Sequence, residues 1–406
     1  MKEKRLLFDM RIMTVPFIMA LFFLCFIQPT NGQKKSNKHP LTQIDTEPFA
    51  DNFNHWYRGF DKERIINPLP DMPRYKPTDL EAIGDNILLF QKNNGGWAKN
   101  YDVFAILTQA QKDSIRNNKN VFNTTFDNGT CYTQIAALAI VYNNTKKEQY
   151  QEAALKGIDY LLKAQYDNGG WPQYYPLEEG YSRHITYNDD AMVGVMKLLK
   201  DILDNKPQYG FINAGYRLKI KNSFEKGMDC IIRTQILDQG KLTAWCQQHD
   251  EVTLQPAWAR KFEPASICSR ESADLVLFLM SIDHPSKEII NAIQNVVVWF
   301  KDSEIKNTRV DRIDAPRMVT PFRISTTDKV VVIDSSAPPI WTRYYELKTH
   351  KPIFCNRDSK IVYTLAEVTR ERRDGYAWYN YSPQKVLNSY PKWQKKWVPD
   401  SNVLHN

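Results

Sequence analysis

Hydrophobic and polar positions follow a helical period from about residue 77 to about residue 300. Within this stretch the same pattern occurs three times: an apolar helix that ends near a Gln, a turn that contains Gly in the first two units, and then a Trp. Trp97, Trp171 and Trp245 follow one another at equal intervals of 74 residues. Since a single helix pair cannot bury its apolar face alone, such a repeat predicts stacked helix pairs.

The first helices of the three units are predicted around residues 84–91, 157–165 and 227–235, and a second apolar helix follows each turn, at 132–142, 191–202 and 272–282. Six main helices in three pairs predict an all-α fold. A ring of antiparallel pairs, an (α/α)3 toroid, would leave no pair with an open edge. The alternative is an open solenoid, which usually needs more units or capping pairs.

The regions on either side of the repeats have a different character. Residues 309–332 contain β-rich stretches and predict a hairpin-bearing arm. Residues 336–406 are dense in aromatics and Arg but contain little continuous apolar sequence, so we expect them to wrap the toroid, with a few short hairpins and long loops. We therefore expect a polar N-terminal tail over 33–75 that packs on the domain, one main domain over 76–390, and a C-terminal tail over 391–406.

The N-terminus has the pattern of a secretory signal peptide. Basic residues, from Lys2 to Arg11, precede an apolar run over 15–27, and a small, polar stretch ends at Gly32. The run is too short for an ordinary membrane span. We expect residues 1–32 to be a signal peptide and the mature chain to be secreted or periplasmic, without a membrane span.

The charge balance is mildly positive, at +8, and it is spread along the chain without a dense basic block. A nucleic-acid-binding surface is therefore not expected, whereas an acidic partner or a polyanionic substrate is favoured. The chain has 10 Trp and 21 Tyr, and aromatic side chains often stack on sugar rings, although most aromatics are core. No Cys-x-x-Cys spacing occurs, which argues against a zinc site or a disulfide framework.

Polar and charged residues stand directly before each of the three second helices. They are Asp127 and Asn128 in the first unit, Asp189 and Asp190 in the second, and Glu263, Arg270 and Glu271 in the third. Each of them alone could be a helix cap, because Asp, Asn and Ser accept hydrogen bonds from free helix N–H groups. In a toroid, however, they converge on one mouth of the ring. Carboxylates that face one another repel unless a cation lies between them, and hard oxygen ligands suit Ca²⁺.

Arginines beside aromatic residues add positive charge in the C-terminal part. Arg343 and Arg357 are each flanked by aromatics, whereas Arg372 and Arg373 also fit a solvated helix face. Arg pairs with carboxylates in a bidentate manner. Carboxylates, a cation and several arginines next to Trp and Tyr would form a site for an acidic sugar polymer.

Eight short motifs between about Ile83 and Tyr379 carry a family resemblance. They are residues 95–100 (GGWAKN), 125–128 (TFDN), 168–174 (NGGWPQY), 187–192 (YNDDAM), 245–250 (WCQQHD), 259–263 (ARKFE), 343–347 (RYYEL) and 354–358 (FCNRD). Together they resemble the pectate lyases of polysaccharide lyase family 10. Two positions depart from the family pattern: Ala98 stands where the family often has Pro, and Asn356 where it often has Gly. Neither departure removes a charge.

The resemblance implies an (α/α)3 toroid and β-elimination on de-esterified polygalacturonate, also called pectate, to give 4,5-unsaturated oligogalacturonides. It implies Asp127 and Asp189 as Ca²⁺ ligands, with Asp190 as an alternate, and Lys99, Asn128, Arg343 and Arg357 as binders of substrate carboxylates. The family is thought to use an Arg as the base that removes the proton α to the uronic carboxylate. We favour Arg260 over Arg270, because ARKFE resembles the family motif more closely than SRES does. We expect a monomer.

Three other classes of protein fit parts of the sequence. A terpenoid cyclase toroid also has Gln, Gly and Trp repeats, but it would show an Asp-rich acid motif in an apolar cavity and no signal peptide. An (α/α) toroid glycoside hydrolase would need two opposed carboxylic acids rather than an Arg. A non-catalytic protein that binds acidic polysaccharides could keep the aromatics and lack the base.

Overall fold

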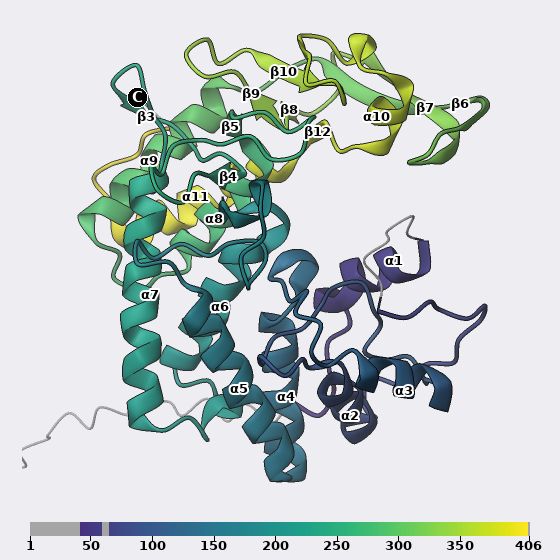
Figure 1. Ribbon diagram of the computed structural model, residues 1–406. Helices are drawn as coiled ribbons and strands as arrows, with labels where there is room; N and C mark the ends of the chain where they lie inside the picture. Colours follow the sequence, from purple (N-terminus) through teal and green to yellow (C-terminus); the bar gives the residue numbers. More distant parts are fainter. Residues whose placement is uncertain (1–40, 59–64, 405–406) are drawn as a thin grey trace, which may run out of the picture. The chain divides into compact units, whose positions relative to one another are not determined.

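The computed structural model describes residues 41–58 and 65–404. In this part the α-helices are α1 (Ala50–Arg58), α2 (Leu80–Phe90), α3 (Gln109–Asn117), α4 (Tyr132–Thr145), α5 (Glu148–Ala164), α6 (Ala191–Leu203), α7 (Ala214–Thr234), α8 (Ser269–Met280), α9 (Lys287–Asp302), α10 (Arg370–Gly375) and α11 (Ser382–Trp397). The helices and the longer strands are drawn in Figure 1. The six helices expected from the repeats are confirmed as α2, α5 and α7 and as α4, α6 and α8.

The strands are short apart from one long hairpin. They are β1 (Ile185–Thr186), β2 (Leu237–Asp238), β3 (Lys241–Leu242), β4 (Gln248–His249), β5 (Ile267–Cys268), β6 (Thr308–Val319), β7 (Ile324–Ile333), β8 (Trp341–Thr342), β9 (Tyr344–Tyr345), β10 (Pro352–Cys355), β11 (Ile361–Val362) and β12 (Tyr379–Asn380). The predicted hairpin is confirmed as β6 and β7, which pair antiparallel with an irregularity between Asp314 and Met318.

The main helices pack in two rows. In one row α4 packs on α6, α6 on α8 and α8 on α11, and in the other α2 packs on α5, α5 on α7 and α7 on α9 (Figure 1). Other helix contacts join one row to the other, as between α4 and α5, but among the described residues no extensive contact joins α2 or α4 to α9 or α11. The helices therefore form an open row of four pairs.

The Trp and the Gln of each repeat explain why the same sequence pattern gives the same helical unit each time. The indole N–H groups of Trp97, Trp171 and Trp245 donate to carbonyl oxygens of the preceding helix, at 2.9, 2.9 and 2.8 Å. The Gln at the end of each first helix bridges its own turn to the next helix of the row. Thus the amide of Gln91 donates to carbonyls of Gly95 and of Ala153 in α5, and Gln165 and Gln235 do the same toward α7 and α9.

The turns between helix and Trp require glycine. Gly95 and Gly169 have φ values of 98° and 94°, which side-chain-bearing residues rarely adopt. A Cβ atom at Gly95 would lie 2.5 Å from the carbonyl oxygen of Lys156, and one at Gly169 would lie 2.0 Å from that of Lys226. The close approach of one unit to the next thus depends on both glycines.

The expectation of an all-α (α/α)3 toroid is wrong in two respects. The structure mixes helices with strands, including a four-stranded antiparallel sheet in the order β11-β10-β9-β5. It also has a fourth helix pair, α9 and α11, so the row continues where a three-pair ring would close. In this fourth unit the indole N–H of Trp341 donates to the carbonyl of Phe300 at 2.8 Å, as the other three tryptophans do in theirs.

The four-stranded sheet brings the C-terminal part of the chain to the start of α8. Strand β5 pairs with β9 through Ile267 opposite Tyr345 and Cys268 opposite Tyr344, and β9 pairs with β10. Residues 343–357 therefore lie beside the segment that leads into α8. Helix α11 runs through residue 390, where we expected the main domain to end.

The signal peptide expected over 1–32 lies outside the described residues. Among those that are described, no helix is long and apolar enough to cross a membrane. The five cysteines within the described part, Cys131, Cys230, Cys246, Cys268 and Cys355, are buried and form no disulfide.

Candidate active site

Two short turns of matching conformation stand directly before α4 and α6. They are the 3₁₀ turns η2 (Asp127–Gly129) and η4 (Asn188–Asp190), and they pack against each other. Asn128 has φ 53° and ψ 36°, and Asp189 has φ 49° and ψ 40°. Asp190 is also left-handed, with φ 58°. Non-glycine residues held in this region are strained, and such strain gathers at functional sites.

Helix capping does not account for these residues. The N-cap of α4 is Cys131, and the N-cap of α6 is Asp190, but neither side chain accepts a capping hydrogen bond. The polar residues of the two turns are thus left for another role.

The two turns bring carboxylates together. Asp127 is buried, and its Oδ2 accepts a hydrogen bond from Nζ of Lys99 at 2.8 Å. Its Oδ1 is buried without a hydrogen-bond partner. Burial and then the charge of Asp127 raise the pKa of Asp189 to about 7, although Arg343 acts to lower it. A buried oxygen without a donor, next to a carboxyl that resists ionisation, fits a site for a hard cation.

A cleft of about 560 Å³ opens at these turns. Asn128, Asp189, Asp190 and Arg270 line it, together with Asp51 from α1. Arg270 makes no hydrogen bond or ion pair within the described part of the chain. Four of the nine residues predicted for the site therefore share one cleft, and Asp127 lies beside Asn128.

Arg260 is held by a neighbouring carboxylate. Its Nε donates to Oε2 of Glu263 at 2.7 Å and its Nη2 donates to Oε1, while its side chain stays 45% exposed. Burial acts to lower the pKa of Arg260, but the hydrogen bonds and charge of Glu263 raise it well above its ordinary value. The charge of Asp189 adds to this rise. Nη1 carries no hydrogen bond among the described residues.

Arg343 lies deeper than its predicted role requires. Its side chain is only 4% exposed, and its Nη2 donates to Oδ1 of Asn188 at 2.6 Å and to Oε1 of Glu271. Its Nε is buried without a partner. The guanidinium lies 4.8 Å from the centre of the Tyr376 ring. Arg343 thus joins the η4 turn to α8, and its buried Nε–H has no acceptor among the described residues.

Arg357 belongs to a group of three arginines around one ring. The guanidinium carbons of Arg260, Arg357 and Arg372 lie 5.0, 5.0 and 4.5 Å from the centre of the Phe262 ring. Glu371 accepts hydrogen bonds from both Arg357, at 2.8 and 3.1 Å, and Arg372. Burial, and the nearby charges of Arg357 and Arg260, lower the pKa of Arg372 against the opposing effect of Glu371.

The sequence analysis missed several residues of this site. Asp51 was assigned to a surface tail, and its side chain is 53% exposed, but it lines the cleft. Partial desolvation in the cleft and the charge of Asp127 raise its pKa, while His55, Arg270 and Lys99 act to lower it. Glu371 was not among the predicted residues. Glu263 was, but its pairing with Arg260 was not predicted. The i, i+3 spacing of Arg260 and Glu263 was the one available signal.

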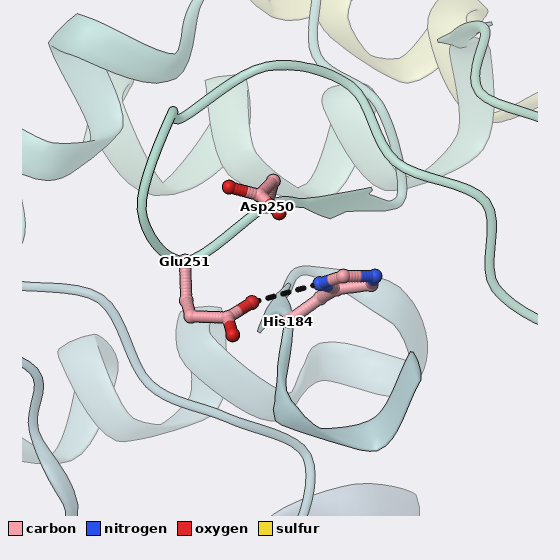
Figure 2. Close-up of side chains that lie close together, drawn as sticks. All are labelled: His184, Asp250 and Glu251. Atoms are coloured by element: carbon pink, nitrogen blue, oxygen red, sulfur yellow. Dashed lines mark hydrogen bonds and ion pairs between the residues drawn. The ribbon is translucent and has the colours of Figure 1, made fainter. Parts of the chain in front are cut away.

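A second group of potential metal ligands is explained by protein contacts alone. His184, Asp250 and Glu251 lie close together, and Figure 2 shows Glu251 reaching Nδ1 of His184 at 2.9 Å. The other oxygen of Glu251 binds Arg183. Oδ1 of Asp250 accepts hydrogen bonds from the backbone N–H groups of residues 252 and 253. With these oxygens already occupied, we assign the group to an ion-pair network that ties the 183–184 loop to the 250–255 turn.

The arrangement fits a site for an anionic substrate: the buried Asp127 with its lysine, the half-buried Asp189 in the adjoining turn, and several arginines that carboxylates hold in place. The comparisons with known proteins agree. The family model described as pectic acid lyase matches residues 91–387. The chain therefore belongs to the pectic acid lyase family and is a pectate lyase, which confirms the resemblance.

Two solved structures of a family 10 polysaccharide lyase from Cellvibrio cellulosa are similar to this chain. One is the lyase itself, with 29% identity and a TM-score of 0.65; the matched region covers 77% of this chain and 92% of that chain. The other is a variant of it in complex with trigalacturonic acid, with 28% identity, the same TM-score and the same coverage. No curated protein sequence matches the chain.

Proposed function

We propose that this lyase cleaves de-esterified polygalacturonate by Ca²⁺-assisted β-elimination, with an arginine as the base. The observation that carries the proposal is the pair of turns η2 and η4. They hold Asp127, with its unpartnered buried oxygen, beside Asp189, whose pKa is raised to about 7. The complex of the similar Cellvibrio cellulosa lyase with trigalacturonic acid supports a galacturonate polymer as substrate.

Asp127 and Asp189 would hold the cation, with Asp190 as a further ligand at the same turn. Ca²⁺ bound there would act as a Lewis acid on the uronic carboxylate, which stabilises the negative charge that develops when the α proton leaves. Lys99, 2.8 Å from Asp127, is placed to donate to the same substrate carboxylate. Donors fixed before the reaction stabilise this charge without reorganisation.

Arg260 is our choice for the base. Glu263 binds its Nε and Nη2 and so leaves Nη1 as the nitrogen that can face the substrate. Because Glu263 raises the pKa of Arg260, proton removal by this residue requires alkaline conditions and a nearby cation. Arg270, which lines the cleft and has no ion pair within the described residues, remains the alternative base.

The other predicted residues have supporting roles in this proposal. Arg357 is 33% exposed and would bind a carboxylate of a neighbouring uronate. Arg343 is bound to Asn188 and Glu271 and would act through them, by holding the η4 turn against α8. Asn128 lines the cleft and can donate from its amide.

The decisive experiment is incubation of the purified enzyme with polygalacturonate and Ca²⁺. We expect ultraviolet absorbance from the 4,5-unsaturated product. A glycoside hydrolase would release reducing ends without this absorbance, and a binding protein would release neither. The Asp127→Ala variant should fold as the parent does, as checked by circular dichroism, and form no product. Reducing ends without absorbance would overturn the proposal.

We further propose that the enzyme is secreted and acts as a monomer. The support is the N-terminal pattern of residues 1–32 and the polymeric nature of the substrate. Cleavage near Gly32, measured by mass spectrometry of the mature protein, is the expected result.

A further inference from the structure

Helix α1 lies outside the segment that the family model matches, which begins at residue 91. Even so, α1 packs directly on the η2 turn. Its anchor at the far side is Trp56, which is buried and donates its indole N–H to the carbonyl of Ile66 at 2.9 Å. What α1 presents to the active site is a separate feature, centred on Asn52.

The Asn52 side chain is buried and makes three hydrogen bonds. Its Oδ1 accepts from the backbone N–H of Asn100 at 2.6 Å. Its Nδ2 donates to the carbonyl oxygen of Asn128 at 2.7 Å and to Oγ1 of Thr130 at 3.2 Å. One amide therefore clamps two segments that are far from it in the sequence, and a buried amide so satisfied is costly to replace.

Both clamped segments carry residues of the site. Asn100 follows Lys99, Asn128 follows Asp127, and Nζ of Lys99 lies 2.8 Å from Oδ2 of Asp127. Asn100 and Asn128 are both left-handed, with φ values of 65° and 53°. The Nδ2 group of Asn128 also donates to Oδ1 of Asn100 at 3.3 Å. Strained backbone persists only where its surroundings hold it, and Asn52 hydrogen-bonds to both strained residues.

The segment before α1 supports the same contact. A Cβ atom at Gly129 would lie 2.6 Å from the carbonyl oxygen of Pro48, so the N-terminal segment fits against the η2 turn without space for a side chain. Gly129 has φ 74°. The N-terminal segment and the η2 turn therefore pack closely against each other.

We propose that Asn52 is a positioning residue of the active site: it fixes the 99–100 and 127–128 segments, and with them the placement of Lys99 against Asp127. The inference rests on the proposed function, because the placement matters for the cation and for the substrate carboxylate. A helix that served stability alone would not need this polar clamp at the site.

The test compares Asn52→Ala with two variants of the same helix in the full chain. Trp56→Phe removes the hydrogen bond to Ile66 and serves as a purely structural control. Asn54→Ala removes an amide that makes no hydrogen bond within the described residues. We expect Asn52→Ala to lower kcat at least tenfold at saturating polygalacturonate and Ca²⁺, and to weaken Ca²⁺ binding measured by calorimetry without substrate. Trp56→Phe should lower the thermal midpoint but leave kcat and Ca²⁺ affinity unchanged. Asn54→Ala should leave kcat and Ca²⁺ affinity unchanged as well.

Asn52→Ser keeps a hydroxyl at this position and should recover part of the lost kcat; it also replaces Asn52→Ala if that variant does not fold. The inference is overturned if both Asn52 variants lower the thermal midpoint as Trp56→Phe does while kcat and Ca²⁺ affinity stay at the parental values. If the parental enzyme forms no unsaturated product, the proposed function fails, and the Ca²⁺ titration alone decides on Asn52. A parental chain that binds no Ca²⁺ would overturn both.

Discussion

Replacing Asp189 with Asn should stabilise the enzyme at alkaline pH when calcium is absent. Burial, together with Asp127, raises the pKa of Asp189 from 3.8 to about 7. The neutral acid is therefore the form that the folded, metal-free protein prefers, and ionisation of Asp189 works against folding. This contribution to stability is fully present below about pH 4 and is lost as the pH rises through about 7.

The size of the effect follows from the shift in the Asp189 pKa. A difference of about three pH units corresponds to about 4 kcal/mol. Asp189 is half-buried, and solvent screens part of the interaction, so we expect about 1–3 kcal/mol. Asn matches the neutral carboxyl in shape and tolerates the left-handed backbone of Asp189, as Asn128 does in the equivalent turn.

The assay is urea unfolding in EGTA at about pH 5 and about pH 9, on either side of the Asp189 pKa. The free energy of unfolding of the parent should be lower at about pH 9 than at about pH 5. For Asp189→Asn the decrease should be smaller. Asp190→Asn removes a carboxylate from the same turn and is the matched control, for which we expect no comparable gain. Calcium should restore the parent at alkaline pH but not help Asp189→Asn. If the free energy of unfolding decreased equally in the parent and in Asp189→Asn between the two pH values, the reasoning would be refuted.

Further predictions concern activity on polygalacturonate. EGTA should abolish product formation, and Ca²⁺ rather than Mg²⁺ should restore it, because Mg²⁺ demands a tighter octahedral geometry; full activity in EGTA would contradict the metal assignment. Arg260→Lys should lower kcat by about 10²–10⁴-fold, while Arg270→Lys, measured beside it at alkaline pH, should be much milder; the reverse order would make Arg270 the base. Asp51→Asn should raise the Ca²⁺ concentration needed for half-maximal activity without lowering the thermal midpoint. Highly methyl-esterified pectin should be a poor substrate, and equal rates on both polymers would contradict the carboxylate-binding role of Arg357.

The helices could be predicted because local hydrogen bonds impose the repeat. Each Trp returns to its own first helix, and each Gln reaches the next helix of the row, so residue types and intervals are fixed together. The fourth unit escaped prediction because the β6–β7 hairpin, over 308–333, stands between α9 and Trp341 and breaks the interval of 74 residues. Most strands are only two residues long, too short for an alternating pattern to be seen.

The site was predictable only where its residues stand in the polar turns before the second helices of the repeat. Asp127 and Asp189 precede equivalent helices, and the structure brings their turns together. Asn52 lies 76 residues before Asn128 in a polar segment without a pattern, so no signal in the sequence relates the two. The arginines could be identified by type, and the spacing of Arg260 and Glu263 hinted at their pairing. The Glu partners of Arg343 and Arg357 follow from β5–β9 pairing and from α10, which only the folded chain provides.

These partners change what the arginines can do. Glu263 binds Arg260, Glu271 binds Arg343, and Glu371 binds Arg357. They are therefore not free cations that attract a polyanion by charge alone. A guanidinium has five N–H donors in a fixed fork, and a bidentate carboxylate occupies two of them and fixes the direction of the rest. The paired glutamates weaken the long-range attraction of the site for a polyanion. In return, the remaining N–H donors are already oriented when the substrate carboxylate binds, and oriented donors stabilise developing negative charge most.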